Sequence, residues 1–355
     1  MRDTKQIFSF QEKSYSPPPE SIGRKRSDVK LLYVRDTTKF YSILRFEDIA
    51  KIIPRDSLLL FNDSMIIPAR FNVILERTKK NLLVHVGRLP DSYVVEIRVG
   101  KLEAREGDRL IFEDGSMLQL HSRMPSFSRY WIAYPDGRFD LEKLGFKFGS
   151  YINYGNFEYR PHDGVYSSEF AKVPGSVEYP SASRAFTQDI LCALRDKNVE
   201  IRTLTLHCNL ASLDADEFWT SEKLLPEYYN VPAETASALN RKINSGGKVI
   251  AVGTSVVRAL ETIYDGHQYV PGNGWTDIFI KKSLRSPISG LVTGMHDPST
   301  SHILLLEAFC SPELLVSAYQ TAEEYGFRWH EFGDVALIVR EPRNMMYPTI
   351  TQSVR

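Results

Sequence analysis

The sequence has few cysteines and no arrangement of them that would hold a fold together. Cys192, Cys208 and Cys310 are the three cysteines of the 355 residues, and none has a C-x-x-C spacing. This pattern argues against a disulfide framework and against a structural zinc site. It favours a protein of the reducing cytoplasm.

Long apolar runs and an excess of charge are also absent. No apolar stretch approaches the roughly 18 residues of a membrane span, and the start MRDTKQIFSF lacks the apolar core of a signal peptide. Lysine plus arginine equals aspartate plus glutamate at 44 each. We therefore expect no membrane partner and no global basic field, although a local basic stripe would suffice for nucleic-acid binding.

Common nucleotide and metal motifs are missing as well. The sequence contains neither G-x-x-x-x-G-K-[ST] nor G-x-G-x-x-G after a strand, which argues against P-loop and ordinary dinucleotide enzymes. Its eight histidines form no H-E-x-x-H or similar spacing. We expect no bound metal.

What is present indicates a globular α/β protein. The length suits two domains, or one α/β domain with an insertion, and 43% of the residues are hydrophobic. Up to about Arg26 the chain is polar and proline-rich, so this segment is expected to lie on the surface or to dock as an arm. VKLLYVRD and FYSILRF then predict paired strands, and SLLLFND predicts a buried strand.

The stretch 66–135 has a different pattern. Six short strands are predicted there without a helix: ARFNVILER, NLLVHVGRL, SYVVEIRV, DRLIFE, MLQLHSR and YWIAYP. Their connections carry turn residues such as Asp114-Gly115. We interpret 66–135 as a small all-β barrel domain inserted into an α/β domain made of 1–65 and 136–355.

Helices and strands alternate in the second half. Thr187 precedes one predicted helix, Pro232 a second, and Ser311-Pro312 a third. Strands VEIRTLTLH, KVIAV and VALIV follow these helices in turn. Such units favour a mostly parallel sheet flanked by helices.

The segment VIAVGTSVVRALE, residues 249–261, predicts a buried strand, a turn of small residues and a helix start. Ligands of open α/β sheets bind where helix N-termini follow the carboxyl ends of strands. Gly253 would allow a close approach, the hydroxyls of Thr254 and Ser255 would bind ligand oxygens, and Arg258 would face an anion. The alternative is a simple helix cap with Arg258 in solvent.

Other polar residues occupy positions typical of sites. His207 ends an apolar strand, and His296 lies in the loop TGMHDP. Glu227 and Asp277 are acidic residues among aromatic and apolar neighbours, as in a pocket wall. Structural roles remain an alternative for each of them.

Taken in order, these segments resemble the S-adenosylmethionine:tRNA ribosyltransferase-isomerases of queuosine biosynthesis. The resemblance is carried by LLLFNDSMIIPARF (58–71), AKVPGSVEYPSASRAFT (171–187), TLH (205–207), EYYNVP (227–232), GGKVIAVGTSVVRALET (246–262), GNGWTDIFI (272–280), TGMHDPSTS (293–301) and GFRWHEFGDVALI (326–338). It implies an α/β domain with an inserted barrel. The implied reaction moves the ribosyl group of S-adenosylmethionine to a 7-deazaguanine in tRNA, with loss of adenine and methionine.

The resemblance also implies roles for residues. S-adenosylmethionine is the implied substrate, with tRNA as a partner and no metal. The implied catalytic residues, for proton transfer or for an anionic and aromatic environment around the sulfonium, are His207, Glu227, Asp277 and His296. The implied substrate-binding residues are Asn62, Asp63, Arg70, Gly253, Thr254, Ser255, Arg258, Trp275 and Thr276.

The chain departs from the family pattern at several positions. Ala185, Gly294 and Ser299 stand where the family has His, Asn and Lys, and Leu225 replaces a second histidine. A glycine-rich loop after His207 is replaced by residues 208–211. These changes keep two alternatives open, a paralogue that uses a small-molecule acceptor and a noncatalytic binding protein of the same fold.

Overall fold

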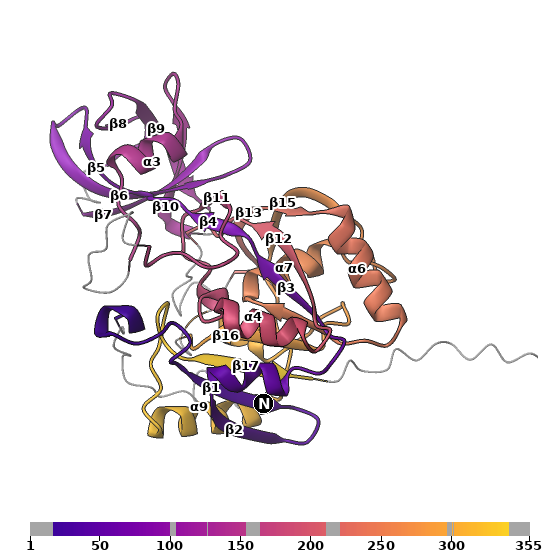
Figure 1. The fold of residues 1–355 in the computed structure, drawn as a ribbon. Helices are drawn as coiled ribbons and strands as arrows, with labels where there is room; N and C mark the ends of the chain where they lie inside the picture. Colours follow the sequence, from indigo (N-terminus) through magenta and orange to yellow (C-terminus); the bar gives the residue numbers. More distant parts are fainter. Residues whose placement is uncertain are drawn as a thin grey trace, which may run out of the picture.

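The computed structural model describes residues 17–99, 104–125, 127–153, 164–210, 221–296, 300 and 302–340. A closed β-barrel lies above a layered α/β part, and the chain enters and leaves the barrel on the side that faces this sheet (Figure 1). Residues 1–16 of the predicted N-terminal arm lie outside the described residues.

The main sheet has nine strands within the described residues, in the order β15-β13-β12-β3-β14-β16-β17-β1-β2. The strands are β1 (Lys30–Arg35), β2 (Phe40–Arg45), β3 (Leu58–Asn62), β12 (Glu200–Leu206), β13 (Lys223–Val231), β14 (Val249–Val252), β15 (Gly272–Ile278), β16 (Gly290–Gly294) and β17 (Val335–Val339). The predicted pairing of β1 with β2 and the predicted buried strand β3 are confirmed.

The prediction of a mostly parallel sheet was wrong, because the sheet is mixed. Its centre is parallel, with β3 between β12 and β14 and with β16 beside β14. β13 and β15 add an antiparallel edge, and β17 runs antiparallel to β16. The polar and aromatic residues of β13 and β15 concealed these strands in the sequence. Between β16 and β17, the described residues form two helices instead of one crossover helix.

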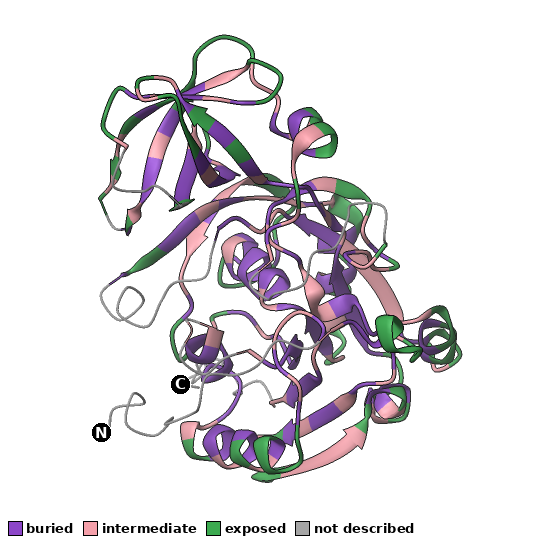
Figure 2. Ribbon diagram, turned by 90° about the vertical axis from the view of Figure 1, so that its left-hand side faces the viewer, coloured by how far each residue is buried: buried purple, intermediate pink, exposed green. Residues whose placement is uncertain are grey.

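Side-chain alternation along the buried strands makes two apolar layers. In β3, Leu58 and Leu60 belong to one core cluster, whereas Leu59 and Phe61 belong to another. Adjacent side chains of a strand point to opposite faces, so the central sheet is buried on both sides. Figure 2 shows the buried strands running between helices whose outer faces are exposed.

Helices cover both layers. They are α2 (Ile49–Ile52), α3 (Leu141–Phe148), α4 (Gln188–Arg195), α6 (Ala233–Asn244), α7 (Thr254–Ile263), α8 (His302–Leu306) and α9 (Pro312–Glu324), with 3-10 turns η1 (Pro19–Ile22), η2 (Phe46–Asp48) and η4 (Ser181–Ser183). The three predicted helix starts are confirmed, although the Thr187 side chain makes no capping hydrogen bond.

The six predicted strands of 66–135 are all present and close into an antiparallel barrel within the described residues. They are β5 (Arg70–Leu75), β6 (Lys80–Arg88), β7 (Tyr93–Val99), β8 (Arg109–Ile111), β9 (Met117–Met124) and β10 (Phe127–Pro135). Alternate residues of β5 are buried, as expected for a barrel wall filled from inside. Helix α3 packs on β5, where Gly145 approaches the Pro68 carbonyl.

Two short strands join the barrel to the sheet. β4 (Ser64–Ile66) continues from β3 toward the barrel and pairs in parallel with β11 (Val173–Ser176). β11 therefore leads the chain back beside its entry point. In the described part of the chain, no helix is both long and apolar enough to cross a membrane.

Candidate functional site

A cavity of about 440 Å³ lies at the carboxyl ends of the central parallel strands. Asn62 ends β3, Val252 ends β14, and Thr293 lies near the end of β16; all three line the cavity. The barrel supplies Glu96, Arg98, Arg129 and Tyr130 to the wall. The cavity therefore lies where the two parts of the chain meet, at the edge predicted from the strand order.

The bend at residues 253–255 opens on this cavity. Gly253 has a φ of 106°, which disfavours any side chain, and its N–H donates to the Val292 carbonyl at 2.8 Å. No side chain caps α7 here. Capping of the helix therefore does not explain why hydroxyl residues stand at positions 254 and 255. Thr254 and Ser255 instead line the cavity together with Gly253.

Asn62 holds the strands that carry the bend. Its Nδ2 donates to the Leu206 carbonyl at 2.8 Å and to Ser255 Oγ at 3.2 Å. Its Oδ1 accepts the N–H groups of Ser64 and Leu206, each at 3.0 Å. Asn62 thus ties β3, β12 and α7 together beneath the cavity, and its amide has little capacity left for a ligand.

Two predicted residues, Glu227 and Arg258, form a buried ion pair with each other. Glu227 is fully buried on β13, and Arg258, one turn into α7, is 7% exposed. Burial raises the pKa of Glu227, and the Arg258 guanidinium opposes that shift. The Asn209 N–H also donates to Glu227 Oε1 at 3.0 Å. The pair is neutral overall, so Arg258 is not a free cation awaiting a carboxylate.

His296 lines the cavity and is stacked on His302, with ring centroids 4.0 Å apart and planes 5° apart. Burial, and then the neighbouring His330, lowers the pKa of His296 to about 4. Burial, followed by His296 and Arg258, lowers the pKa of His302 well below 6.5. Both rings are therefore neutral at pH 7.

Another part of the wall is formed by the loop from Glu178 to Ser183 and by His330 and Glu331. Burial, followed by the Glu178 carboxylate, raises the pKa of Glu331 to about 8. Glu331 thus keeps its proton at neutral pH. The cavity thus holds a protonated carboxyl group that can donate a proton and neutral imidazoles, among them His296, that can accept one.

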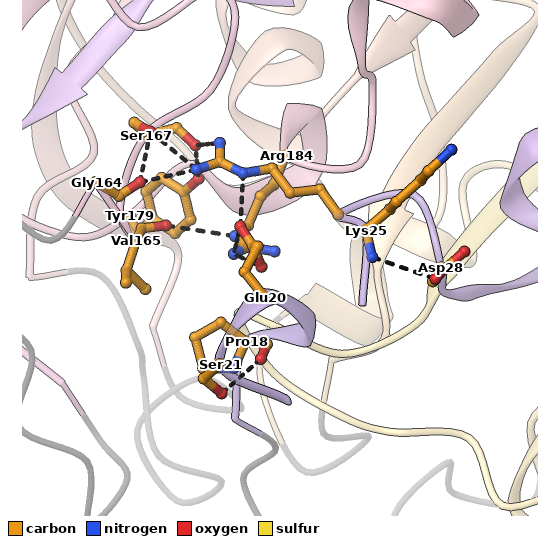
Figure 3. Close-up of polar contacts among 11 residues, drawn as sticks. Pro18, Glu20, Ser21, Lys25, Asp28, Gly164, Val165, Ser167, Tyr179 and Arg184 are labelled. Atoms are coloured by element: carbon orange, nitrogen blue, oxygen red, sulfur yellow. Dashed lines mark hydrogen bonds and ion pairs between the residues drawn. The ribbon is translucent and has the colours of Figure 1, made fainter. Parts of the chain in front are cut away.

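This loop is fixed from behind by an ionic cluster (Figure 3). Arg184 Nη2 donates to both carboxylate oxygens of Glu20 at 2.6 and 2.7 Å, and Arg26 Nε donates to Glu20 at 2.6 Å. Burial acts to raise the pKa of Glu20, but the bond from Arg184 lowers it. The Tyr179 hydroxyl donates to the Ser167 carbonyl at 2.8 Å. The described end of the predicted N-terminal arm therefore docks, and it holds the cavity wall.

A smaller pocket of about 190 Å³ lies beside the cavity and contains two of the other predicted site residues, His207 and Trp275. His207, Tyr228 and Trp275 line it, and Cys208 lines both spaces. Burial, followed by the Arg88 charge, lowers the pKa of His207 to about 4. The structure thus places His207 and Trp275 apart from the 253–255 bend.

Four predicted site residues line neither space. Asp63 accepts a hydrogen bond from Thr205 at 2.7 Å, and Arg70 starts β5. Thr276 lies 2.7 Å from the Thr262 hydroxyl on α7, and Asp277 forms a surface ion pair with Lys223 at 2.6 Å. Their contacts in the structure are with protein groups away from the cavity.

The departures from the family pattern fall in different environments. Ala185 and Leu225 are buried in the apolar cores. Gly294 approaches Ser181 and the His330 carbonyl near the cavity wall. Cys208 lines the cavity, and burial raises the pKa of its thiol to about 12. Ser299 and Ala211 lie outside the described residues.

Several residues that line the cavity were not predicted from the sequence: Glu178, Ser181, Thr293, His302, His330 and Glu331. Thr293 ends the run GLVT, and a polar residue at the end of a buried strand was a usable signal. The others come from loops whose positions depend on tertiary packing. Among the described residues, no group of three histidine, cysteine, aspartate or glutamate side chains is arranged to hold a metal ion.

Comparison with known proteins establishes the family. Residues 8–338 match the family described as queuosine biosynthesis protein. The chain belongs to this family, and the resemblance inferred from its motifs is confirmed.

Individual relatives agree over nearly the whole length. The S-adenosylmethionine:tRNA ribosyltransferase-isomerase of Natranaerobius thermophilus is 33% identical over 348 residues, covering 93% of this chain and 99% of the relative. The same-named protein of Caldanaerobacter subterraneus is 32% identical over 304 residues, covering 83% and 88%. The crystal structure of S-adenosylmethionine tRNA ribosyltransferase from Thermotoga maritima superposes loosely, with a TM-score of 0.48 and 23% identity over 93% of this chain and 96% of that one.

The buried ion pair yields a first prediction. Glu227→Gln keeps the shape of the side chain but leaves the Arg258 charge buried and uncompensated. We expect the free energy of unfolding in urea to fall by about 3–5 kcal/mol, and the double variant Glu227→Gln, Arg258→Met to recover part of this loss. Asp277→Asn, which breaks an exposed ion pair, is the control and should change much less. An equal loss of unfolding free energy in Glu227→Gln and in Asp277→Asn would contradict the assignment of a buried ion pair.

The stacked histidines yield a second prediction. His296 titrates near 6.5 in the unfolded chain and near 4 in the folded one. As the pH falls, protons thus bind this residue in the unfolded chain before they bind it in the folded one. The contribution of His296 to stability is therefore fully present above pH 6.5 and is lost as the pH falls toward 4. For His296 the slope is at most about 1.4 kcal/mol per pH unit. His296→Phe, which keeps the ring, should lose less stability than the wild type between pH 7 and pH 5 in urea unfolding; identical slopes would refute this account.

Proposed function

We propose that this chain is an S-adenosylmethionine:tRNA ribosyltransferase-isomerase acting in queuosine biosynthesis in the cytoplasm. It moves the ribosyl group of S-adenosylmethionine to a 7-deazaguanine in tRNA and releases adenine and methionine. The match to the family and to relatives of that name across the chain supports this function. S-adenosylmethionine is then a substrate, and no metal takes part.

The observation that carries the proposal is the open 253–255 bend on a cavity of about 440 Å³. The α/β domain of residues 1–65 and 136–355 provides the sheet ends and the first turn of α7, and the inserted barrel domain 66–135 provides part of the wall. The first N–H groups of a helix have no partner within the helix and carry a partial positive charge. With Thr254 and Ser255 they bind the methionine carboxylate or the ribose hydroxyls.

Electrostatics favour the positively charged sulfonium. Four carboxyl side chains line the cavity: Glu96, Glu178, Glu227 and Glu331. The Glu227 charge is balanced by Arg258, and Glu331 keeps its proton. On the barrel side, Glu96 lies beside two arginines that also line the cavity, with Oε1 at 2.9 Å from Arg98 Nη1 and at 4.0 Å from Arg129 Nε. The Glu178 carboxylate acts on the Glu331 side of the cavity, and there it attracts a cation.

Proton transfer is assigned to groups that line this cavity. A sulfonium acidifies the adjacent carbon, and the neutral His296 accepts the proton from it. The protonated Glu331 donates a proton to the departing adenine. His207 and Asp277 lie away from the 253–255 bend, so neither is assigned a role as acid or base.

The two alternatives predict different outcomes of one experiment. The purified chain is incubated with S-adenosylmethionine, with and without tRNA that carries the aminomethyl deazaguanine, and the products are separated by chromatography. We expect release of adenine and methionine that depends on the tRNA, with tRNA binding that weakens as salt rises. S-adenosylhomocysteine, which lacks the sulfonium charge, is the control and should release nothing.

Release without dependence on tRNA would instead indicate that the ribosyl group is transferred to a small molecule, which in this assay is water, and not to tRNA. Absence of release under all conditions, despite measurable binding of S-adenosylmethionine, would indicate a noncatalytic binding protein. Either result contradicts the proposed tRNA reaction.

Thr293 provides a separate test of the ligand position. Its hydroxyl is fully buried, lines the cavity and has no hydrogen-bond partner among the described residues. A ligand would satisfy it. Thr293→Val, of nearly the same shape, should weaken S-adenosylmethionine binding about 2- to 12-fold in calorimetry, while the stability of the free protein stays equal or rises. Thr293→Ser keeps the hydroxyl and should bind like the wild type. Equal affinities of the Val and Ser variants would place the ligand elsewhere.

A further inference from the structure

The pocket of about 190 Å³, here called the ring pocket, is lined by His207, Tyr228, Trp275 and their neighbours. It lies across β13 from the cavity, because Glu227 lines the cavity and the next residue, Tyr228, lines the ring pocket. Cys208 borders both spaces. A ligand extending past Cys208 would therefore reach from one space into the other.

Three aromatic side chains form a row in the ring pocket. Tyr228 and Trp275 face each other on the paired strands β13 and β15, with ring centroids 5.8 Å apart. His207 follows β12, and its ring is nearly parallel to that of Tyr228, at 5.7 Å and 23°. All three are half-buried, so they present ring surface to the pocket.

His207 is held as a neutral ring in this row. Its Nδ1 lies 2.8 Å from the Ser64 hydroxyl, which also contacts the Ser176 hydroxyl at 2.6 Å. Gly175 passes so close that a Cβ there would lie 2.6 Å from Nε2 of His207. With its pKa near 4, the imidazole is uncharged at neutral pH. These contacts suit a rigid stacking surface better than a mobile proton carrier.

Two polar side chains of the pocket, Asn209 and Arg88, are bonded to the protein. Asn209 Nδ2 donates to the Arg88 and Pro226 carbonyls at 2.7 and 2.9 Å, and its Oδ1 accepts the Leu210 N–H at 2.9 Å. The Arg88 guanidinium lies 2.8 Å from Glu142 on α3. Neither of these two side chains is therefore the main attraction for a ligand, and the aromatic rings make up the rest of the recognition surface.

We propose that the ring pocket binds one planar heteroaromatic base by contact with the rings of Tyr228, His207 and Trp275. The base stacks on the Tyr228–His207 pair and meets Trp275 edge to face, because the planes of Tyr228 and Trp275 are 73° apart. The inference rests on the proposed function, which supplies two such bases, the adenine of S-adenosylmethionine and the acceptor base of the tRNA. The volume is below the roughly 300–1,000 Å³ of pockets for drug-sized ligands, so it suits a single ring system. Enzymes that modify a base in nucleic acid bind it unstacked from its neighbours, commonly against aromatic side chains.

The test compares substitutions on the two faces of β13. Tyr228→Leu removes the central ring, Tyr228→Phe keeps it, and Tyr229→Leu makes the same change on the opposite face, where Tyr229 packs near Gly274 and lines neither space. Affinity is measured by calorimetry with S-adenosylmethionine and by filter binding with an anticodon stem-loop RNA that carries the deazaguanine. Thermal unfolding checks that each variant is folded.

Tyr228→Leu should bind one of the two ligands about 5- to 150-fold more weakly, the range expected for losing the stacking of one base. Tyr228→Phe and Tyr229→Leu should bind both ligands like the wild type. Weaker binding of S-adenosylmethionine identifies adenine as the occupant, and weaker binding of the RNA identifies the acceptor base. If Tyr228→Leu is unfolded, Trp275→Leu takes its place with the same expectation.

Unchanged affinity of Tyr228→Leu for both ligands, alongside normal wild-type binding, would overturn the inference and leave the proposed function intact. Wild-type protein that binds neither ligand would overturn the proposed function, and the inference with it.

A stacking role for His207 leads to a separate prediction. His207→Ala should raise the KM for the substrate whose base occupies the ring pocket by a larger factor than it lowers kcat. The opposite split would assign His207 to proton transfer and contradict the stacking role.

Discussion

The buried ion pair between Glu227 and Arg258 constrains the rest of the site. It joins β13 to α7, and so it couples the antiparallel edge of the sheet to the helix that begins at the 253–255 bend. Either charge alone in this position would be strongly unfavourable, whereas the two together are tolerated. Glu227 also separates the two spaces, because its neighbour Tyr228 faces the ring pocket. Formation of the Glu227–Arg258 ion pair thus fixes the positions of the cavity, the bend and the ring pocket relative to one another.

Burial sets the protonation of the site in a way that suits a cationic substrate. His296, His302 and His207 all have lowered pKa values and are neutral, so they add no positive charge that would repel a sulfonium. Glu331 is shifted in the opposite direction by burial and by Glu178. Desolvation therefore produces both a neutral acceptor and a protonated donor in one cavity, without a metal in the proposed mechanism.

Local patterns were sufficient for the parts of the fold in which each strand carries its own signal. The six barrel strands alternate apolar and polar residues between clear turns, and all six are present. The last two strands at one side of the sheet, β13 and β15, have no such alternation, and the direction of β17 depends on the path through α8 and α9. The sheet is mixed for these reasons. The sequence motifs were also sufficient to identify the family, and the comparison with relatives confirms it.

By itself, the sequence determined which short segments would form strands, where the bend at Gly253 falls and to which family the chain belongs, because these depend on residues close together in the chain. Tertiary structure alone decided which of the polar residues meet. It paired Arg258 with Glu227, stacked His207 on Tyr228, and brought Glu331 and Glu178 to the cavity from distant loops. Charge pairing and desolvation depend on distance in space and on burial, and neither is encoded in any single segment.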